Sequence, residues 1–257
     1  MNKIYSSIIM ADLHRIFASW RVYASIVIAL FFLLRPLFDA SASWANMSPL
    51  QLLSLPFGAS DFSPFAVMFC VFPFADSFCV DYNSGIINNI TTRVKVNRFA
   101  KQRVITVALS GASVMFICVL IPIIFCNVFA GKDETYETAY FMRNTIWWKA
   151  GVLLPLNGLV FYWGRLVLAA LFGALWSLIA LAISTIVTNR YVTLIIPFVL
   201  CQALWYLLGE SPFNPVQLIR ADNSNVPFLS FAILYQITLI IFFSVLSIIG
   251  IKKKVSI

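Results

Sequence analysis

Charged residues are scarce in this sequence: Asp, Glu, Lys and Arg together make up 11% of its 257 residues, whereas 61% are hydrophobic. Soluble domains carry about 25% charged residues, so the low charge excludes an ordinary soluble globular protein. Long apolar runs recur along the chain, and a helix of about 20 residues crosses the hydrocarbon layer of a membrane. Because these runs lack the alternating pattern of barrel strands, they predict an all-α, polytopic membrane protein.

The sequence contains a single histidine and no nucleotide-binding motif. His14 is the only histidine, which excludes a multi-histidine metal site and disfavours a histidine-based catalytic triad. No G-x-x-x-x-G-K-[ST] phosphate-binding loop occurs. The five cysteines lie in apolar runs without the spacing of metal ligands. We therefore expect no catalytic, cofactor-binding or metal-binding residues in this chain, and no enzyme activity of its own.

Six apolar segments predict six transmembrane helices in a single transmembrane domain that covers residues 1–257. Their approximate ranges are 22–38, 62–80, 104–129, 165–187, 192–208 and 228–251. Residues 3–21 place apolar side chains at helical spacing, interrupted by charges, which predicts an amphipathic helix lying in the membrane interface. The alternative is a simple cytoplasmic extension of the first transmembrane helix.

The positions of the cations predict the topology, because cytoplasmic loops collect Lys and Arg. With both termini in the cytoplasm, twelve of the 18 cations are cytoplasmic and five lie outside. The outside segments are then 39–61, 131–163 and 209–227, and the PVQLI sequence in the last of these predicts a short re-entrant helix. Topology thus explains the net charge of +8, and we expect no nucleic-acid partner.

The segment 81–103, DYNSGIINNITTRVKVNRFAKQR, is the most basic internal part of the chain. Its five cations fall within eleven residues and have no acid between them: Arg93, Lys95, Arg98, Lys101 and Arg103. Gly85 permits a turn. Ile86, Ile87 and Ile90 would then form an apolar knob that can enter a groove on a soluble partner. This pattern predicts a cytoplasmic docking loop; the alternative is that the cations reflect the topology rule alone.

Ionisable residues inside the predicted spans are few. Arg35, near the outer end of the first span, is expected to snorkel to the interface, with a place in a transport pathway as the alternative. Asp76, near the inner end of the second span, is expected to be hydrated, with burial beside a partner or a place in the pathway as the alternatives. So few charges disfavour an ion-coupled secondary carrier.

Small residues recur along one face of the predicted fourth helix. Ala169, Gly173 and Ser177 follow one another at intervals of four residues. Stripes of this kind let helix backbones approach closely in membranes. We therefore expect this face to pack against another helix or another subunit.

Two stretches resemble a known family. MADLHRIF, residues 10–17, is similar to the "adlyRlf" first helix of the membrane subunits of type-2 ATP-binding-cassette exporters, the ABC-2-type permeases. DYNSGIINNITTRVKVNRFAKQR resembles the Glu-x-x-x-Gly-Thr loop of the same family, with Asp81 in place of the commoner Glu and Ile86 in place of the usual Thr. The resemblance covers the whole chain in topology and is specific in motif over about residues 9–20 and 76–103.

The resemblance implies that the loop carries a coupling helix, which docks on a separate ATPase subunit that would bind ATP and Mg. Motif position assigns the following residues to the coupling region: Asp81, Gly85, Thr92, Arg93 and Arg98. The family also implies a bacterial cytoplasmic membrane protein that pairs with a second copy of itself or with a homologous permease. The expected cargo is an amphiphilic peptide, an antibiotic or a lipid-like substrate.

Within the family, the compact size and the MADLHRIF stretch are most similar to the lantibiotic-immunity and multidrug-export branch. Two other functions fit the same sequence. One is a non-transporting immunity or sensor component of the same fold, and the other, less favoured, is a stand-alone secondary carrier.

Overall fold

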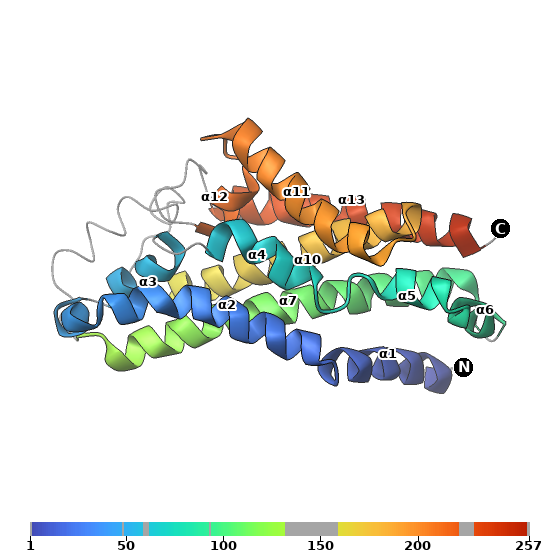
Figure 1. The fold of residues 1–257 in the computed structure, drawn as a ribbon, viewed down its shortest axis with the longest axis horizontal. Coiled ribbons are helices and arrows are strands. Elements are labelled where there is room, and N and C mark those ends of the chain that lie inside the picture. Colours follow the sequence, from blue (N-terminus) through green and yellow to red (C-terminus); the bar gives the residue numbers. More distant parts are fainter. Residues whose placement is uncertain are drawn as a thin grey trace.

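The computed structural model describes residues 2–47, 49–58, 62–92, 94–131, 159–220 and 229–255, and every regular element within these ranges is a helix. Most of the helices run along one long axis, and the two ends of the chain lie at the same end of the bundle, near α5 and α6 (Figure 1). The all-α class predicted from the sequence is confirmed.

Five of the described helices are long and apolar enough to cross a membrane, which indicates a multi-pass membrane protein. They are α2, α7, α10 from Tyr162 onward, α11 and α13. In chain order, the elements are α1 (Asn2–Phe17), α2 (Trp20–Asp39), the 3-10 helix η1 (Ser41–Asn46), α3 (Pro49–Gly58), α4 (Phe62–Val71), α5 (Ser77–Asn83), α6 (Ile86–Thr91), α7 (Val96–Phe129), α10 (Leu159–Ile186), α11 (Arg190–Leu208), α12 (Pro215–Arg220) and α13 (Leu229–Val255).

The predicted second span, 62–80, is not one continuous helix. α4 ends at Val71, residues 72–76 form turns, and α5 begins at Ser77. Pro73 explains the break, because its ring lacks an N–H donor and disfavours helical geometry at the residue before it. Neither piece is long enough to cross a membrane alone, so only the pair together would span it.

α7 begins eight residues earlier than the predicted third span, at Val96 rather than at residue 104. Its 34 residues correspond to about 51 Å of helix, well beyond the roughly 30 Å of a hydrocarbon layer. The predicted loop 81–103 is therefore mostly helical, and only residues 92–95 separate α6 from α7. Lys95, Arg98, Lys101 and Arg103 lie at or within the start of a helix that continues into the bundle.

Short helices fill two of the segments predicted to lie outside the membrane. η1 and α3 occupy most of 39–61, and α12 coincides with the PVQLI sequence predicted as a short helix in 209–227. Val216, Leu218 and Ile219 of α12 are buried, and α12 packs against α10, α11, α4 and α3. The third segment predicted to lie on the outer side, 131–163, is mostly not among the residues that the structure describes.

α10 lies at the centre of the bundle. Of the residues in its most apolar stretch, 72% are buried in the protein. The corresponding share is 17% for α11 and for α13, so most of the apolar surface of these two helices faces away from the bundle. A Cβ atom on Gly173 would approach the Gly111 carbonyl oxygen of α7 to 2.2 Å, so both positions require glycine for this contact. Ser177 Oγ donates to the Cys70 carbonyl oxygen of α4 at 2.9 Å. The stripe that includes Ala169 thus packs inside the chain, against other helices.

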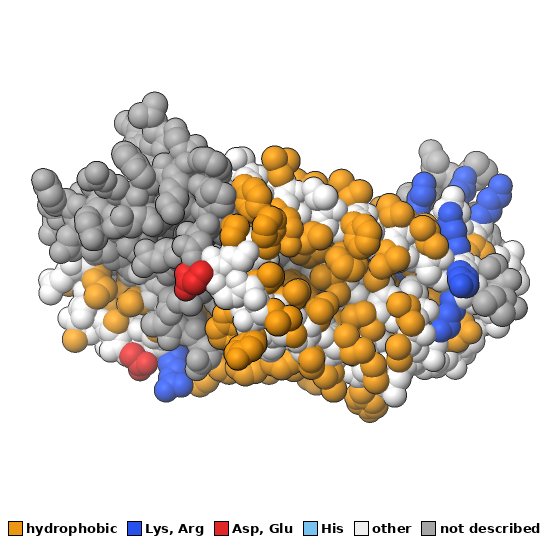
Figure 2. Space-filling view, turned by 90° about the horizontal axis from the view of Figure 1, so that it is seen from above, with side chains coloured by type: hydrophobic (Ala, Val, Ile, Leu, Met, Phe, Trp, Pro, Cys, Tyr) orange, Lys and Arg blue, Asp and Glu red, His pale blue; other side chains and the backbone are white. Residues whose placement is uncertain are grey.

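Most of the exposed Lys and Arg side chains seen in Figure 2 lie at one end of the described structure. Lys and Arg side chains crowd the end that carries the C-terminus, which we call the basic end. The described acidic residues that are exposed, Asp39 and Glu210, lie at or just beyond the last residues of α2 and α11, whose first turns carry Arg21 and Arg190.

Candidate functional site

The predicted docking segment folds as two short helices joined by a turn at the basic end. α5 ends at Asn83, Gly85 adopts the left-handed conformation with φ +72°, and α6 begins at Ile86. The Asn83 side-chain amide donates to the Thr188 carbonyl oxygen at 2.9 Å, which joins the end of α5 to the turn between α10 and α11. The turn predicted at Gly85 is confirmed.

The predicted apolar knob on α6 is used mainly inside the protein. Ile87 is buried, with 3% of its surface exposed, and Ile90 is half-buried against the hydrophobic core. Only Ile86 is exposed, at 43%. The prediction of a three-residue docking knob is therefore wrong for Ile87, because residues three apart share one helix face and that face packs inward with Ile90. The exposed residues of α6 are Ile86, Asn88 and Asn89.

The other predicted coupling residues lie beside α6. Thr92 Oγ1 donates to the Asn89 carbonyl oxygen at 2.9 Å and closes the last turn of α6. Arg98 is exposed on the first turn of α7. Arg93 lies outside the described residues, so its place is not assigned.

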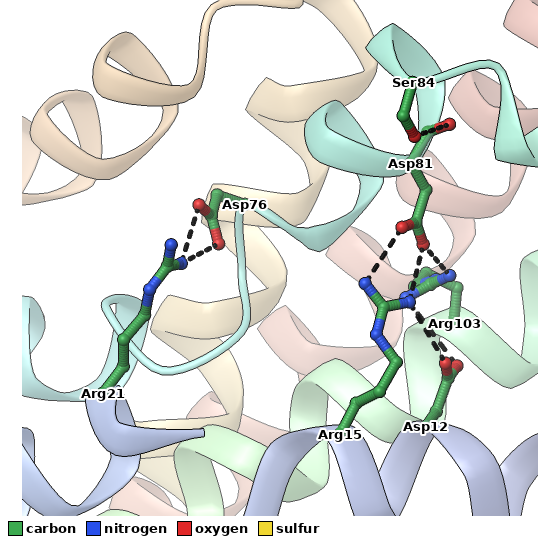
Figure 3. Close-up of polar contacts among 7 residues, drawn as sticks. All are labelled: Asp12, Arg15, Arg21, Asp76, Asp81, Ser84 and Arg103. Carbon is green, nitrogen blue, oxygen red and sulfur yellow. Dashed lines mark hydrogen bonds and ion pairs between the residues drawn. The ribbon is translucent and has the colours of Figure 1, made fainter. Parts of the chain in front are cut away.

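Asp81 is the centre of a buried ion-pair cluster rather than an exposed loop residue. Its carboxylate is fully buried and accepts hydrogen bonds from Arg15 of α1 at 3.0 and 3.2 Å (Figure 3). Arg103 of α7 donates a third bond from Nη2 at 2.5 Å. One carboxylate of α5 therefore connects three helices, and it offers no free oxygen surface to a docking partner.

Arg103 is itself buried, with 1% of its surface exposed. A second carboxylate, Asp12 of α1, lies 3.7 Å from Arg103 Nη1 and 3.9 Å from Arg15 Nη1. The rings of Phe74 and Phe99 face the Arg103 guanidinium at 5.6 and 5.3 Å, a distance at which aromatic rings attract cations. We call Asp12, Arg15, Asp81 and Arg103 the Asp81 cluster; it contains two acids and two bases and is therefore balanced in charge.

Burial in this cluster changes the pKa of Asp12. Burial raises the pKa of the Asp12 carboxyl above its ordinary value of 3.8, and the nearby Arg103 and Arg15 guanidiniums oppose that rise. The Asp81 carboxylate adds a further, smaller upward effect on the pKa of Asp12. The two acids of the cluster thus compete for the same two arginines, and Asp81 holds the shorter contacts.

Asp76 forms a second buried cluster in the turn between α4 and α5. Only 2% of its surface is exposed. Arg21 Nη1 donates to its two carboxylate oxygens at 3.1 and 3.0 Å (Figure 3), and Arg190 Nε lies 2.7 Å from Oδ2 as an ion pair. The expectation that Asp76 is hydrated is wrong, because its carboxylate is buried and pairs with two arginines at the starts of α2 and α11. We call Arg21, Asp76 and Arg190 the Asp76 cluster.

The two clusters hold α5 at both of its ends. Asp76 precedes the first residue of α5, and Asp81 lies in its last turn. Buried ion pairs resist the loss of one partner, since the remaining charge would be left in a medium of low dielectric constant. α5 and the attached α6 are therefore positioned electrostatically by α1, α2, α7 and α11.

Arg35, the other predicted pathway residue, lies apart from both clusters. Its side chain is 68% exposed and pairs with Asp39 one turn later on α2 at 4.0 Å. An exposed arginine near the outer end of an apolar helix agrees with the snorkelling expectation. The structure does not bring Arg35 and Asp76 together.

Sequence reasoning missed the arginines that complete the clusters. The pattern of residues 3–21 predicts an interfacial helix and gives no sign that Arg15 and Arg21 pair with Asp81 and Asp76, and the spacing of cations in 81–103 predicts a loop position for Arg103. One signal was present: Arg103 directly precedes the apolar run that begins at Val104. A cation at the start of such a run is costly to bury unless a carboxylate pairs with it.

Within the described ranges, no group of three or more His, Cys, Asp and Glu side chains could hold a metal ion. Scans against protein-family models and searches of curated proteins and of solved structures find no match to this chain. The geometry of the basic end is therefore the basis on which function can be argued.

Proposed function

We propose that this chain is the membrane subunit of an ATP-driven exporter of the ABC-2 type, in the bacterial cytoplasmic membrane. The observation that carries the proposal is the placement of α6. This short helix projects from a glycine turn at the basic end, between α4–α5 and the long α7, and is held through α5 by two buried ion-pair clusters. A helix placed in this way can transmit a push from a soluble partner to several transmembrane helices.

The proposal includes six membrane crossings with α4 and α5 together forming the second one, and both termini in the cytoplasm. Support comes from the position of both chain ends and of the exposed Lys and Arg side chains at one end of the bundle (Figures 1 and 2). The positive-inside rule would then place the basic end in the cytoplasm. α1, which packs beside α7 at this end, would lie at the inner membrane interface.

In this mechanism the partner is a separate ATPase subunit, which would bind ATP and Mg. Its surface would contact the outward face of α6, made of Ile86, Asn88 and Asn89. Movement of α6 would pass to α5 and then, through Asp81, to Arg15 of α1 and Arg103 of α7. A second copy of the chain or a homologous permease would complete the pathway for an amphiphilic peptide, antibiotic or lipid-like substrate.

Cross-linking tests the contact directly, because the five native cysteines are all buried. We would introduce Asn88→Cys or Asn89→Cys and co-express the chain with candidate ABC ATPases. A cross-linked complex is expected from both variants, and none from the control Glu210→Cys at the opposite end. Failure of every candidate ATPase to co-purify or cross-link would remove the main support for the proposal.

Transport coupling tests the role of the contact. Ile86→Asp should uncouple ATP hydrolysis from export without preventing membrane insertion, because it places a charge on the exposed apolar side chain of α6. Ile186→Asp, an exposed apolar residue at the same end but on α10, is the matched control. If ATPase docking occurs but no export is ever detected, the immunity or sensor alternative is the better function.

A tag scan tests the membrane topology independently of the ATPase. Tags at residues 45, 90, 140, 190 and 220 should report outside, inside, outside, inside and outside in that order. Any other order would overturn the six-crossing arrangement.

A further inference from the structure

The end of α10 lacks a cap of its own, a feature that the proposed coupling mechanism does not use. α10 ends at Ile186, residues 187–189 are not helical, and α11 begins at Arg190. The last carbonyl groups of a helix have no partner inside it and need donors from elsewhere. Glycine in the left-handed conformation often provides the closing turn. This junction contains no glycine, and the Asn189 side chain caps the start of α11 instead.

Side chains of α5 supply two of the missing donors. The Asn83 amide donates to the Thr188 carbonyl oxygen at 2.9 Å. The buried Cys79 thiol lies 3.4 Å from the Val187 carbonyl oxygen and 3.7 Å from that of Ser184. Its single proton can serve one of these oxygens at a time. α5 therefore closes the end of a helix that lies about a hundred residues later in the chain.

The C-terminal end of α13 supplies another donor. Lys254 Nζ donates to the Ile186 carbonyl oxygen at 3.3 Å and lies 5.4 Å from the centre of the Tyr82 ring of α5. A cation at the C-terminus of a helix also balances the negative end of the helix dipole, and an aromatic ring at this distance attracts it. α5 and α13 thus meet over the end of α10, the central helix of the bundle.

The contacts of α5 differ in strength on its two sides. Toward α1 and α7, Asp81 pairs with Arg15 and with the buried Arg103, and breaking a buried charge pair is costly. Toward α10, the contacts are one neutral amide bond and one thiol contact, which contribute less. α5 has only seven residues, with turns before it at residues 72–76 and after it at Gly85. Such turns can act as hinges, so α5 can leave α10 while it stays with α1 and α7.

One charged contact crosses the same boundary. Arg190, the first residue of α11, pairs with Asp76 at 2.7 Å. The Arg190 side chain is 40% exposed, and Asp76 keeps Arg21 of α2 as a second partner. Water can therefore replace this contact at Arg190 without leaving the buried carboxylate unpaired.

We propose that α5 is a removable cap on α10. While side chains of α5 bind the carbonyl groups at residues 184–188, α11 is held against the end of α10; when α5 leaves, this junction opens. Cys79 also lies 3.3 Å from Thr193 Oγ1 in the first turn of α11, so the same thiol joins α5 to both helices. Displacement of α5 through α6 rests on the proposed function, whereas the cap itself is a property of this chain alone.

Hydrogen exchange of the purified protein in neutral detergent tests the cap. Cys79→Ala/Asn83→Ala removes both side-chain donors of α5. Exchange of the backbone amides of residues 187–193 should become roughly tenfold faster, because each lost hydrogen bond contributes about a factor of three. Asn83→Ala alone changes only an exposed side chain and should give about a threefold increase.

A matched control separates the cap from a general loss of stability. Cys70→Ala/Asn97→Ala removes a thiol that bonds within α4 and an exposed amide on α7, and should leave exchange at residues 187–193 unchanged. If the α5 variants show no increase, or the control shows an equal one, α5 does not cap α10.

A disulfide tests whether the junction opens by loss of α5. Because the Cys79 sulfur lies 3.3 Å from Thr193 Oγ1, Thr193→Cys places a second sulfur within reach of a disulfide. Oxidation should slow exchange at residues 187–193 by roughly tenfold relative to the same protein after reduction, because the cross-link limits the separation of the two helices. Equal exchange in both forms would show that the junction opens while α5 stays in place. Failure to form the disulfide would show that α5 does not reach α11; either result contradicts the cap.

Export tests the consequence of the cap for the proposed function. In a complex with an ATPase identified by the Asn88→Cys cross-link, oxidation of the Thr193→Cys variant should abolish export and reduction should restore it, while the ATPase stays bound. Continued export by the oxidised complex would mean that α5 need not leave α10, which overturns the proposal and leaves the ATPase partnership intact. A chain that binds no ATPase would contradict the proposed function, whereas the exchange rates decide the cap in either case.

Discussion

The two buried aspartates of the basic end differ in how their charges are balanced. Asp81 pairs with the buried Arg103 and with Arg15, whose side chain is 46% exposed, whereas both arginines on Asp76 are partly exposed, at 20% and 40%. A desolvated pair loses most when one member is removed, because the other cannot be rehydrated. A carboxylate reached by two partly hydrated guanidiniums keeps one of them after the loss of the other. We therefore expect the Asp81 cluster, which contains the buried Arg103, to lose more stability than the Asp76 cluster when one member is removed.

This difference falls along α5, so the two ends of the same short helix are held in different ways. The end next to α6 is joined to α1 and α7 by the Asp81 cluster. The end next to α4 is joined to α2 and α11 by the Asp76 cluster.

The largest expected effect is at Asp81. Asp81→Asn leaves the buried Arg103 with only the more distant Asp12 carboxylate, 3.7 Å from Nη1, and should lower the free energy of unfolding by about 3–5 kcal/mol. Thermal unfolding of the purified protein in detergent measures the loss. The double variant Asp81→Asn/Arg103→Met should recover part of it, because removing the second charge removes the uncompensated one. If Asp81→Asn has the same melting temperature as the unmodified protein, Asp81 is not the more sensitive of the two buried aspartates.

The next effect is at Asp76. Arg21→Gln should cost only about 1–2 kcal/mol, because Arg190 still pairs with the carboxylate. Removing both arginines together should cost more than the sum of the two single changes, since the last partner is then lost. The same unfolding measurement on the two single variants and the double variant gives this coupling. Additive losses would mean that Arg21 and Arg190 do not substitute for one another.

A smaller effect is expected at the turn that links α5 to α6. Gly85→Ala should cost about 1 kcal/mol, because a Cβ atom disfavours the left-handed conformation at φ +72°. No neighbouring atom lies within 4 Å of that Cβ position, so steric contact adds nothing. Gly85→Asn is the control and should cost less, since asparagine tolerates this conformation better. Equal melting temperatures of all three proteins would show that the turn is not held in the left-handed region.

The smallest effect concerns pH and Asp12. Because burial raises the pKa of Asp12 in the folded protein, the folded state holds this proton more tightly than the unfolded state. The resulting stabilisation is complete below the unfolded pKa of about 3.8 and is lost as the pH rises through the higher folded value. Melting temperatures across mildly acidic pH should therefore fall less steeply with rising pH for Asp12→Asn. The exposed Asp39→Asn variant is the control, and an unchanged slope in Asp12→Asn would contradict the burial effect.

Much of the fold could be predicted from local pattern alone. Apolar runs identified all five long helices, because a helix that must satisfy its own backbone in lipid needs a continuous apolar stretch. Gly85 predicted a turn, and the PVQLI sequence predicted α12. The ends of helices were less predictable: α7 extends eight residues beyond its apolar run, since polar residues continue a helix as readily as apolar ones once it has begun.

The candidate site was predicted only in outline. The segment was found from its charges, but which of its side chains point outward depends on packing against α7 and on the arginines of α1. Ile87 and Arg103 illustrate this: the pattern predicts a docking residue at Ile87 and a loop cation at Arg103, whereas both side chains are buried. No spacing within 81–103 could show that Arg15, 66 residues earlier, completes the coordination of Asp81.

Hydropathy alone predicts that this protein is helical and crosses a membrane, because each apolar segment must satisfy its own backbone in lipid. The pairing of the acids at the basic end depends instead on how distant helices pack. Burial of a carboxylate is tolerable only beside a guanidinium, and the partners of Asp76 and Asp81 come from helices distant in the chain. The position of the segment 81–103 thus depends on residues outside it, above all Arg15.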